Sequence, residues 1–247
     1  MNLIVRAIFL GLIALCLVTT NKECVAQETF NINSSSSTYD VRVTVDKCDP
    51  EQKKEDPDNC TGPGQISIYR KGSASPFQTL KLKNLEINKQ QVAYNGKVNK
   101  KARVLYDDEY SLIFGDFNFD ANEDLAICNG RNGGYGAPSY NVYLYDKESK
   151  KFAENVRFSK LTEGYLGLFF VDAKKRQLTA YSKSGCCYHE TEVYKVVQNR
   201  PVLMEKIVEE ASGGDDTGYV VVITTRKLID GKWVKRVTKK RVKSDEP

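Results

Sequence analysis

The chain has 247 residues, of which 40% are hydrophobic and 28% charged, with a formal net charge of +5 at pH 7. This length allows one sizeable core, and so mild and dispersed a positive charge does not indicate a nucleic-acid-binding protein. The single histidine, His189, and the absence of any Cys-x-x-Cys pair argue against a zinc site.

Residues 1–26 are typical of a secretory signal. A short charged start is followed at 7–20 by an apolar run that is too short for a comfortable transmembrane helix. A cleavage site of small residues fits after Ala26. A lipoprotein anchor on Cys16 or Cys24 is the alternative, but the residues before each cysteine suit it poorly. No later segment is apolar enough to span a membrane, so we expect an exported protein without membrane contact after cleavage.

The serine-rich stretch 27–38 is expected to be a flexible lead-in. Residues 39–238 are predicted to form a single β-rich domain, because short runs in which apolar and polar residues alternate follow one another about every ten residues. These runs are 39–46, 65–70, 77–87, 109–117, 141–146, 177–185 and 191–197. Residues 202–210 fit a strand or a helix equally well.

Two further β-rich runs surround Asp230-Gly231, a strong hairpin signal because both residues tolerate the positive φ of a type I′ turn. The charged residues 239–247 are expected to form a loose tail. This many short strands predict an all-β fold, which is a sandwich, a barrel or a propeller-like array.

Five cysteines remain after cleavage, and export to an oxidising compartment favours disulfides. Cys48 and Cys60 bracket a very polar loop, so a disulfide between them is the first choice. For the other three the spacing leaves alternatives open. Cys186 and Cys187 form a vicinal disulfide, or one of them pairs with Cys128.

The segment 116–124 carries an oxygen-bearing side chain at every second residue. These residues are Asp116, Asn118, Asp120, Asn122 and Asp124. Calcium takes about six to eight hard oxygen ligands, and alternate side chains of a tight loop can converge on one ion. We therefore expect calcium as a cofactor, with Asn122 contributing through its main chain and with Phe117 and Phe119 turned to the core.

This loop is not an EF-hand, because Ile127 stands where that motif needs a bidentate Glu and because the flanking runs are strands. It resembles the loops of integrin-like β-propeller repeats, although Ala121 occupies a position that is often Gly.

The longer run 115–152 resembles a family of periplasmic, calcium-binding lysozyme inhibitors of the Xanthomonas type IV secretion immunity protein type. The shared features are the calcium loop, the Gly-rich stretch Y-G-x-x-S-Y at 135–140 and the alternating strand at 142–146. The resemblance implies an incomplete β-propeller-like array of antiparallel strands with an integrin-like calcium loop. It also implies a periplasmic inhibitor, or immunity protein, whose partner is a lysozyme-like peptidoglycan hydrolase.

Such inhibition implies insertion of a loop into the cleft of the hydrolase, and residues 129–140 are the first candidate. Four glycines let this backbone approach a partner closely. Tyr135 at the tip would suit an interface anchor, and Tyr140 follows it. The alternative is an ordinary long turn with both tyrosines packed down.

The second candidate for the contact is the segment 184–189. Ser184, Gly185 and Tyr188 are similar to the inhibitory loops of lysozyme inhibitors with other folds, and His189 stands beside them.

Catalysis is the weakest of the functional classes, because no Ser-His-Asp arrangement can be singled out and calcium would occupy the obvious acidic cluster. We therefore do not expect an enzyme. The alternative to an inhibitor is a calcium-dependent adhesion or glycan-binding module at the cell surface. Retention on a carbohydrate column would favour that module.

Overall fold

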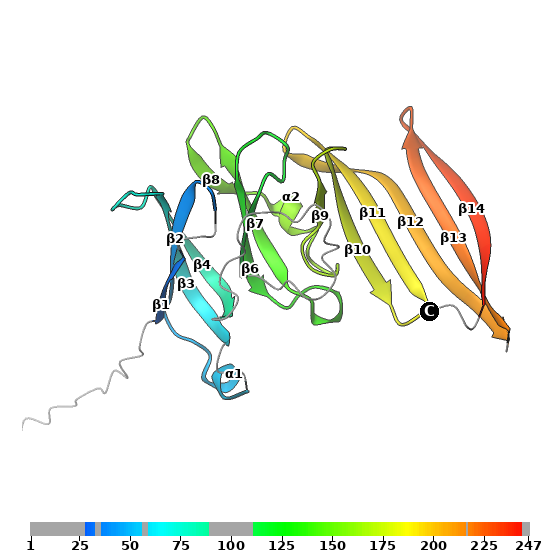
Figure 1. Ribbon diagram of the computed structural model, residues 1–247, viewed down its shortest axis with the longest axis horizontal. Coiled ribbons are helices and arrows are strands. Elements are labelled where there is room, and N and C mark those ends of the chain that lie inside the picture. Colours follow the sequence, from blue (N-terminus) through cyan, green and yellow to red (C-terminus); the bar gives the residue numbers. More distant parts are fainter. Residues whose placement is uncertain (1–27, 33–35, 56–58, 89–110, 216, 244–247) are drawn as a thin grey trace, which may run out of the picture.

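The computed structural model describes residues 28–32, 36–55, 59–88, 111–215 and 217–243. The predicted signal, residues 1–26, lies outside the described residues. The described chain is all-β and antiparallel, as predicted, and its three sheets lie side by side in chain order (Figure 1). Its helices α1 (Pro50–Glu55) and α2 (Val156–Ser159) are too short to cross a membrane.

Each sheet is formed by consecutive strands. The first sheet contains β1 (Glu28–Ile32), β2 (Tyr39–Val45), β3 (Asn59–Arg70) and β4 (Gln78–Asn88). The central sheet contains β5 (Leu112–Gly115), β6 (Asp124–Gly130), β7 (Ser139–Asp146) and β8 (Lys151–Glu154). The third sheet contains β9 (Phe170–Asp172), β10 (Gln177–Ser184), β11 (Tyr188–Val197), β12 (Arg200–Asp215), β13 (Gly218–Ile229) and β14 (Lys232–Lys243).

The central sheet is buried on both faces, because it packs against the first sheet on one side and against the third sheet on the other. Side chains of one strand alternate between the two faces of a sheet, and in β6 both sets are apolar. Leu125 and Ile127 join the first core, which is shared with the first sheet, whereas Ala126 and Cys128 join the second core, which is shared with the third sheet. All four are nearly or completely buried.

Two predictions about the ends of the domain are wrong. Part of the expected lead-in forms β1, in which Phe30 pairs with Val43 of β2. Part of the expected tail, residues 239–243, completes β14 and is paired along its length with β13. In residues 239–243 the hydrogen bonds of the main chain place a strongly charged sequence in a sheet, which composition alone does not reveal. Residues 202–210 lie in strand β12 and not in a helix.

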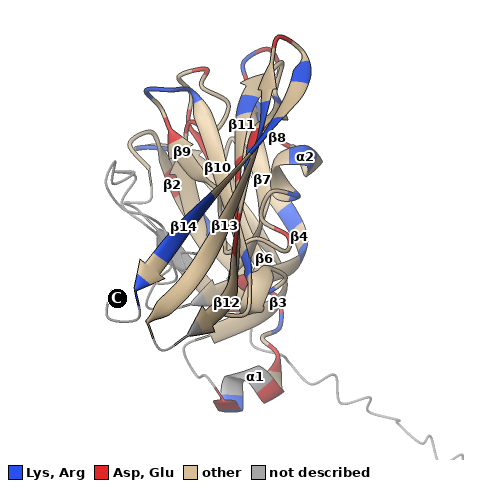
Figure 2. Cartoon of the chain, turned by 90° about the vertical axis from the view of Figure 1, so that its right-hand side faces the viewer, with Lys and Arg blue, Asp and Glu red and all other residues tan. Residues whose placement is uncertain are grey.

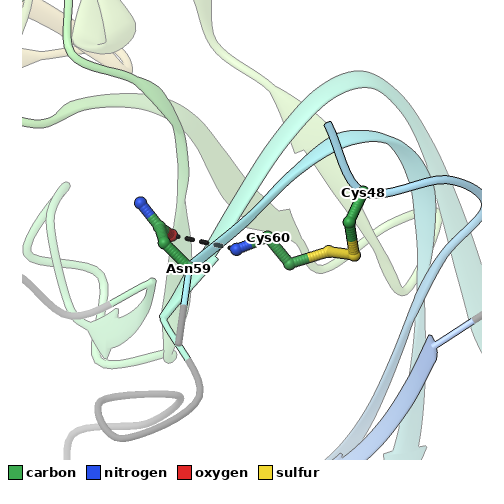
Figure 3. Close-up of a disulfide and its surroundings, with 3 residues drawn as sticks. All are labelled: Cys48, Asn59 and Cys60. Atoms are coloured by element: carbon green, nitrogen blue, oxygen red, sulfur yellow. Dashed lines mark hydrogen bonds between the residues drawn. A yellow bond between two sulfur atoms is a disulfide. The ribbon is translucent and has the colours of Figure 1, made fainter. Parts of the chain in front are cut away.

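The polar loop between β2 and β3 is closed by a disulfide between Cys48 and Cys60, whose Cα atoms lie 4.9 Å apart. Figure 3 shows this bond beside the hydrogen bond from the Cys60 N–H to Oδ1 of Asn59, which is 3.1 Å long. Helix α1 lies inside the closed loop. At the other end of the molecule Asp230 and Gly231 both have positive φ, as the hairpin prediction requires.

Candidate partner-binding site and calcium loop

The predicted calcium loop connects β5 to β6. Phe119 and Ala121 both adopt left-handed backbone conformations, which curl the loop tightly. Phe117 and Phe119 are buried in the second core, on the side expected for them. The loop is therefore fixed by its own two phenylalanines, while its polar residues gather on the outer side.

Two side chains of the loop converge on one backbone N–H group, and a third accepts from the N–H two residues later. The N–H of Asp120 donates to Oδ1 of Asp116 at 2.9 Å and to Oδ1 of Asn118 at 3.2 Å. Oδ1 of Asp120 in turn accepts from the N–H of Asn122 at 2.9 Å. The second oxygen of Asp116 accepts from Ala121 at 2.9 Å. These hydrogen bonds turn the side-chain oxygens of the loop inward, toward its own backbone.

Asp124 is oriented differently from the other acids of the loop, because it is completely buried. One carboxylate oxygen accepts from the N–H of Phe117 at 2.8 Å, and the other accepts from the N–H of Tyr145 at 2.9 Å. Burial raises the pKa of Asp124 to about 7, and the hydrogen bonds from the main chain only partly oppose this. Asp124 therefore ties the loop to the β6–β7 hairpin.

The donor chemistry of the loop fits calcium, since it offers three carboxylates and two amide side chains, all hard oxygen ligands. Asp116, Asn118 and Asp120 are the residues placed to hold an ion, with Asn122 next to them. Across the described ranges, however, no three His, Cys, Asp or Glu side chains cluster as metal ligands. Asp124 does not converge with the other two acids because both of its oxygens bind the main chain.

The first candidate contact segment, residues 129–140, contains the connection from β6 to β7 and is called the Tyr135 loop below. A polar network closes the base of this loop. The Ser139 hydroxyl donates to Asn129 at 2.6 Å and accepts from the Asn132 side chain at 3.0 Å. Asn129 also donates to Asn141 at 2.6 Å. The base of the loop is thereby held by strands of the central sheet.

The middle of this loop rests on residues 164–166. The N–H of Gly134 donates to the carbonyl of Tyr165 at 2.7 Å, and that of Gly164 donates to the carbonyl of Asn132 at 3.1 Å. A Cβ atom on Gly133 would lie 2.7 Å from the Tyr165 carbonyl oxygen, and one on Gly134 would lie 2.9 Å from that of Gly164. Close approach of two backbones therefore requires glycine at both positions.

Tyr135 stands at the tip of the loop, in the 3-10 turn η1 (Gly134–Gly136), and 61% of its side chain is exposed. It adopts a left-handed conformation, with φ 57° and ψ 30°, which is uncommon for an aromatic residue. Its hydroxyl accepts a hydrogen bond from the N–H of Gly185, and the ammonium of Lys183 lies 4.9 Å from its ring centroid. Tyr135 thus leans on the hairpin between β10 and β11.

That hairpin contains the second candidate contact segment, so the fold brings the two candidates together. His189 is exposed on β11 and pairs across the hairpin with Lys183. Cys186 and Cys187 form a vicinal disulfide in the turn, and the carbonyl of Cys187 accepts from the N–H of Ala211 at 2.8 Å. Tyr135, Lys183 and His189 therefore form one continuous surface, although the tyrosine is about 50 residues away in sequence.

Two residues of the sequence prediction are core residues. Tyr140 is 1% exposed in the second core, so the interpretation of this tyrosine as a contact residue is wrong and the packed alternative holds. The strict alternation of β7 explains it, because Tyr140 shares a face with Val142. Cys128 is buried in the same core, where its thiol lies 3.8 Å from the Gly130 carbonyl.

A polar network beneath the loop supports it, and no pattern in the sequence indicates this network. The hydroxyls of Tyr165 and Tyr194 both donate to Glu192, the former at 2.5 Å, and Lys206 donates to Glu192 at 3.1 Å. Burial by itself would raise the pKa of Glu192, but these hydrogen bonds outweigh burial and hold it below its ordinary value. Since Tyr165 also supports Gly134, the network links the loop to the third sheet.

No family model matches the chain, and no curated protein matches it significantly. One solved structure is similar to it. That structure is of a Xanthomonas protein related to the type IV secretion system. The two chains are 25% identical, the match covers 85% of this chain and 92% of that chain, and the TM-score is 0.64. This similarity supports a family relationship between the two proteins.

Proposed function

We propose that this protein is an exported inhibitor of a lysozyme-like peptidoglycan hydrolase, an immunity protein associated with type IV secretion. The similarity to a Xanthomonas protein related to that secretion system supports the association. The two disulfides of the described chain fit an oxidising compartment such as the periplasm. We also propose that the three consecutive sheets are an incomplete propeller-like array.

The observation that carries the proposal is the placement of Tyr135. A large, amphipathic ring projects from a loop whose base, middle and tip are each hydrogen-bonded to a different part of the fold. Such preorganisation lowers the entropic cost of binding, and aromatic anchors of this kind dominate many interfaces. The ring would enter the cleft of the hydrolase, while Lys183 and His189 would contact its rim. Inhibition of this kind requires binding and no catalysis by the inhibitor.

Calcium enters the proposal as a stabiliser. Asp116, Asn118 and Asp120 would hold the ion with the carbonyl of Asn122, and Asp124 would complete the set if one of its oxygens turned from the main chain. The ion would neutralise part of the acidic charge in the loop and lock its curled conformation.

A panel of lysozymes from several classes, assayed by lysis of cell-wall suspensions, tests the proposal. Tyr135→Ala should weaken inhibition by at least about 2 kcal/mol, roughly 30-fold, as expected for a central aromatic anchor. Tyr135→Phe keeps the ring and loses only the contact with Gly185, so most of the inhibition should remain. Tyr69→Ala, a change at a partly exposed tyrosine of β3 in the first sheet, is the matched control.

Absence of inhibition for every class of lysozyme would reject the proposed function. Full inhibition by Tyr135→Ala would show that the main contact lies elsewhere on the surface. His189→Ala would then test the β10–β11 hairpin by itself.

A further inference from the structure

The positive charge of the protein is concentrated in its last hairpin, β13–β14. Residues 218–243 contain nine Lys or Arg residues and one acid, Asp230, which gives a net charge of +8. The whole chain carries +5, so the remainder carries 5 − 8 = −3. Figure 2 shows the basic segments along β14 at the open edge of the third sheet. Such a charge asymmetry points to an anionic partner.

Most of these cations are available to a partner. Lys227 pairs with Glu205 at 3.4 Å, and Arg241 donates to the Thr217 hydroxyl at 2.7 Å. The exposed basic residues of β14 that form no ion pair within the described chain are Lys232, Lys235, Arg236, Lys239, Lys240 and Lys243. Trp233 and Val237 lie between them and are each 50% exposed.

The cations alternate between the two faces of the hairpin, as the register shows. Lys239 pairs with Val222, and the next residue, Lys240, pairs with Val221, so the two lysines lie on opposite faces. A flat lipid surface would contact only one of these faces. Pairing of β14 with its own copy would place like charges opposite one another. A protein surface that fits around the edge of the sheet can approach both sets.

The basic hairpin is continuous with the surface around Tyr135 and His189. A groove of about 240 Å³ runs from Cys186, Cys187 and His189, past Glu209 of β12, to Tyr219 of β13 and Lys240 of β14. Glu209 is the one acid in this lining, and it pairs across the strands with His189. Beyond the vicinal disulfide lies Gly185, on which Tyr135 leans. A partner seated over Tyr135 and His189 would therefore meet the basic edge next.

We propose that the β13–β14 hairpin is a second arm of the partner-binding surface and that it engages an acidic protein surface. The proposal rests on the proposed function in one respect, namely that the acidic surface flanks the cleft of the inhibited hydrolase. The two arms have separate tasks. The hairpin attracts and orients the partner, since charges at the rim of an interface act mainly on the association rate. Tyr135 slows dissociation, since buried anchors act mainly on that rate.

Poly-L-glutamate is a probe of the acidic partner that does not require the hydrolase. Binding by the full chain should weaken about tenfold in the triple variant Lys235→Gln/Lys239→Gln/Lys240→Gln at low salt. The matched control Lys83→Gln/Lys160→Gln/Lys174→Gln removes the same charge from exposed positions elsewhere and should bind as wild type does. About 1 M salt should abolish binding of the wild type, because screening is then effective within about 3 Å. If the triple variant fails to fold, the salt dependence of binding by the wild type tests the proposal in its place.

Equal binding of poly-L-glutamate by both triple variants would overturn the proposal. So would retention by phosphatidylglycerol vesicles without binding of poly-L-glutamate, which would indicate a membrane-binding hairpin. Self-association of the hairpin variant with unchanged binding of the probe would mean that the lysines only protect the sheet edge from aggregation.

A lysozyme that the protein inhibits then separates this proposal from the proposed function. The hairpin variant should associate with it about tenfold more slowly at low salt and dissociate at nearly the same rate, whereas Tyr135→Ala should mainly dissociate faster. If the hairpin variant inhibits the lysozyme with an unchanged association rate, the proposed role of the hairpin is overturned and the proposed inhibitor function stands. Binding of poly-L-glutamate through the hairpin with no lysozyme inhibited rejects the inhibitor function and supports the acidic-partner surface.

Discussion

Removal of the Tyr165 hydroxyl tests whether the buried network under the Tyr135 loop is a source of stability. In the variant Tyr165→Phe the ring remains, whereas the hydroxyl loses its bond to Glu192, 2.5 Å long, and its longer bond with the Tyr194 hydroxyl, 3.4 Å long. Hydrogen bonds to charged groups contribute about 1.5–3 kcal/mol. Glu192 keeps Tyr194 and Lys206 as donors, so the cost should lie near the lower end, about 1.5–2 kcal/mol. For a domain of this size that corresponds to a fall in melting temperature of about 3–8 °C.

Urea unfolding followed by far-ultraviolet circular dichroism measures this difference. Tyr181→Phe is the matched control, because Tyr181 is half-exposed on β10 and its side chain makes no hydrogen bond within the described residues. That control should stay within about 0.5 kcal/mol of wild type. If Tyr165→Phe is as stable as the control, the bond to Glu192 adds nothing beyond what water provides, and the reasoning is refuted.

Three further predictions concern the rest of the fold. Calcium at 100 times its dissociation constant should raise the free energy of unfolding by about 2.7 kcal/mol, and calorimetry should find most of this gain lost in Asp120→Ala but not in Glu148→Ala; equal melting temperatures in calcium and in chelator would exclude a calcium site. Cys48→Ser/Cys60→Ser should lower the free energy of unfolding by about 2–3 kcal/mol in the chain-entropy model. Peptide mapping under non-reducing conditions that finds both thiols free would contradict this disulfide. The folded-state pKa of Glu192 lies below its ordinary value of 4.5, so its carboxylate adds stability above about pH 4.5 that is lost as the pH falls through the folded pKa; the gap in stability to Glu192→Gln should therefore narrow in acid, and a constant gap would contradict the assignment.

The sequence was informative where local chemistry decides the structure. Alternation placed β2, in which Val41, Val43 and Val45 share a buried face, and the Asp230-Gly231 turn placed the last hairpin. The same reasoning missed β1, which is too short to show a pattern beside the serine-rich stretch, and the end of β14, whose charged residues are ordered by hydrogen bonds to β13.

The candidate site could be predicted only in pieces. Tyr135 and the hairpin at 184–189 were each recognisable, but nothing in a single sequence shows that Tyr135 meets Gly185. Likewise, Tyr165, Glu192 and Lys206 lie on different elements, and their convergence depends on how the third sheet packs on the second core. The prediction for Tyr140 rests on its place at the end of the glycine-rich stretch 129–140, whereas the alternation of β7 puts its side chain inside.

The position of β6 limits how calcium could affect the contact surface. The strand begins at Asp124, in the predicted calcium loop, and ends at Gly130, where the Tyr135 loop starts. Seven residues of extended strand span about 20 Å, so an ion held by Asp116 and Asp120 would not reach the loop. Its influence would have to pass along β6 and β7, which Asp124 clamps together through Tyr145. This hairpin is buried on both faces and cannot shift without disturbing both cores. Calcium would therefore act on inhibition mainly by keeping the fold intact, whereas Tyr135 would act on it directly.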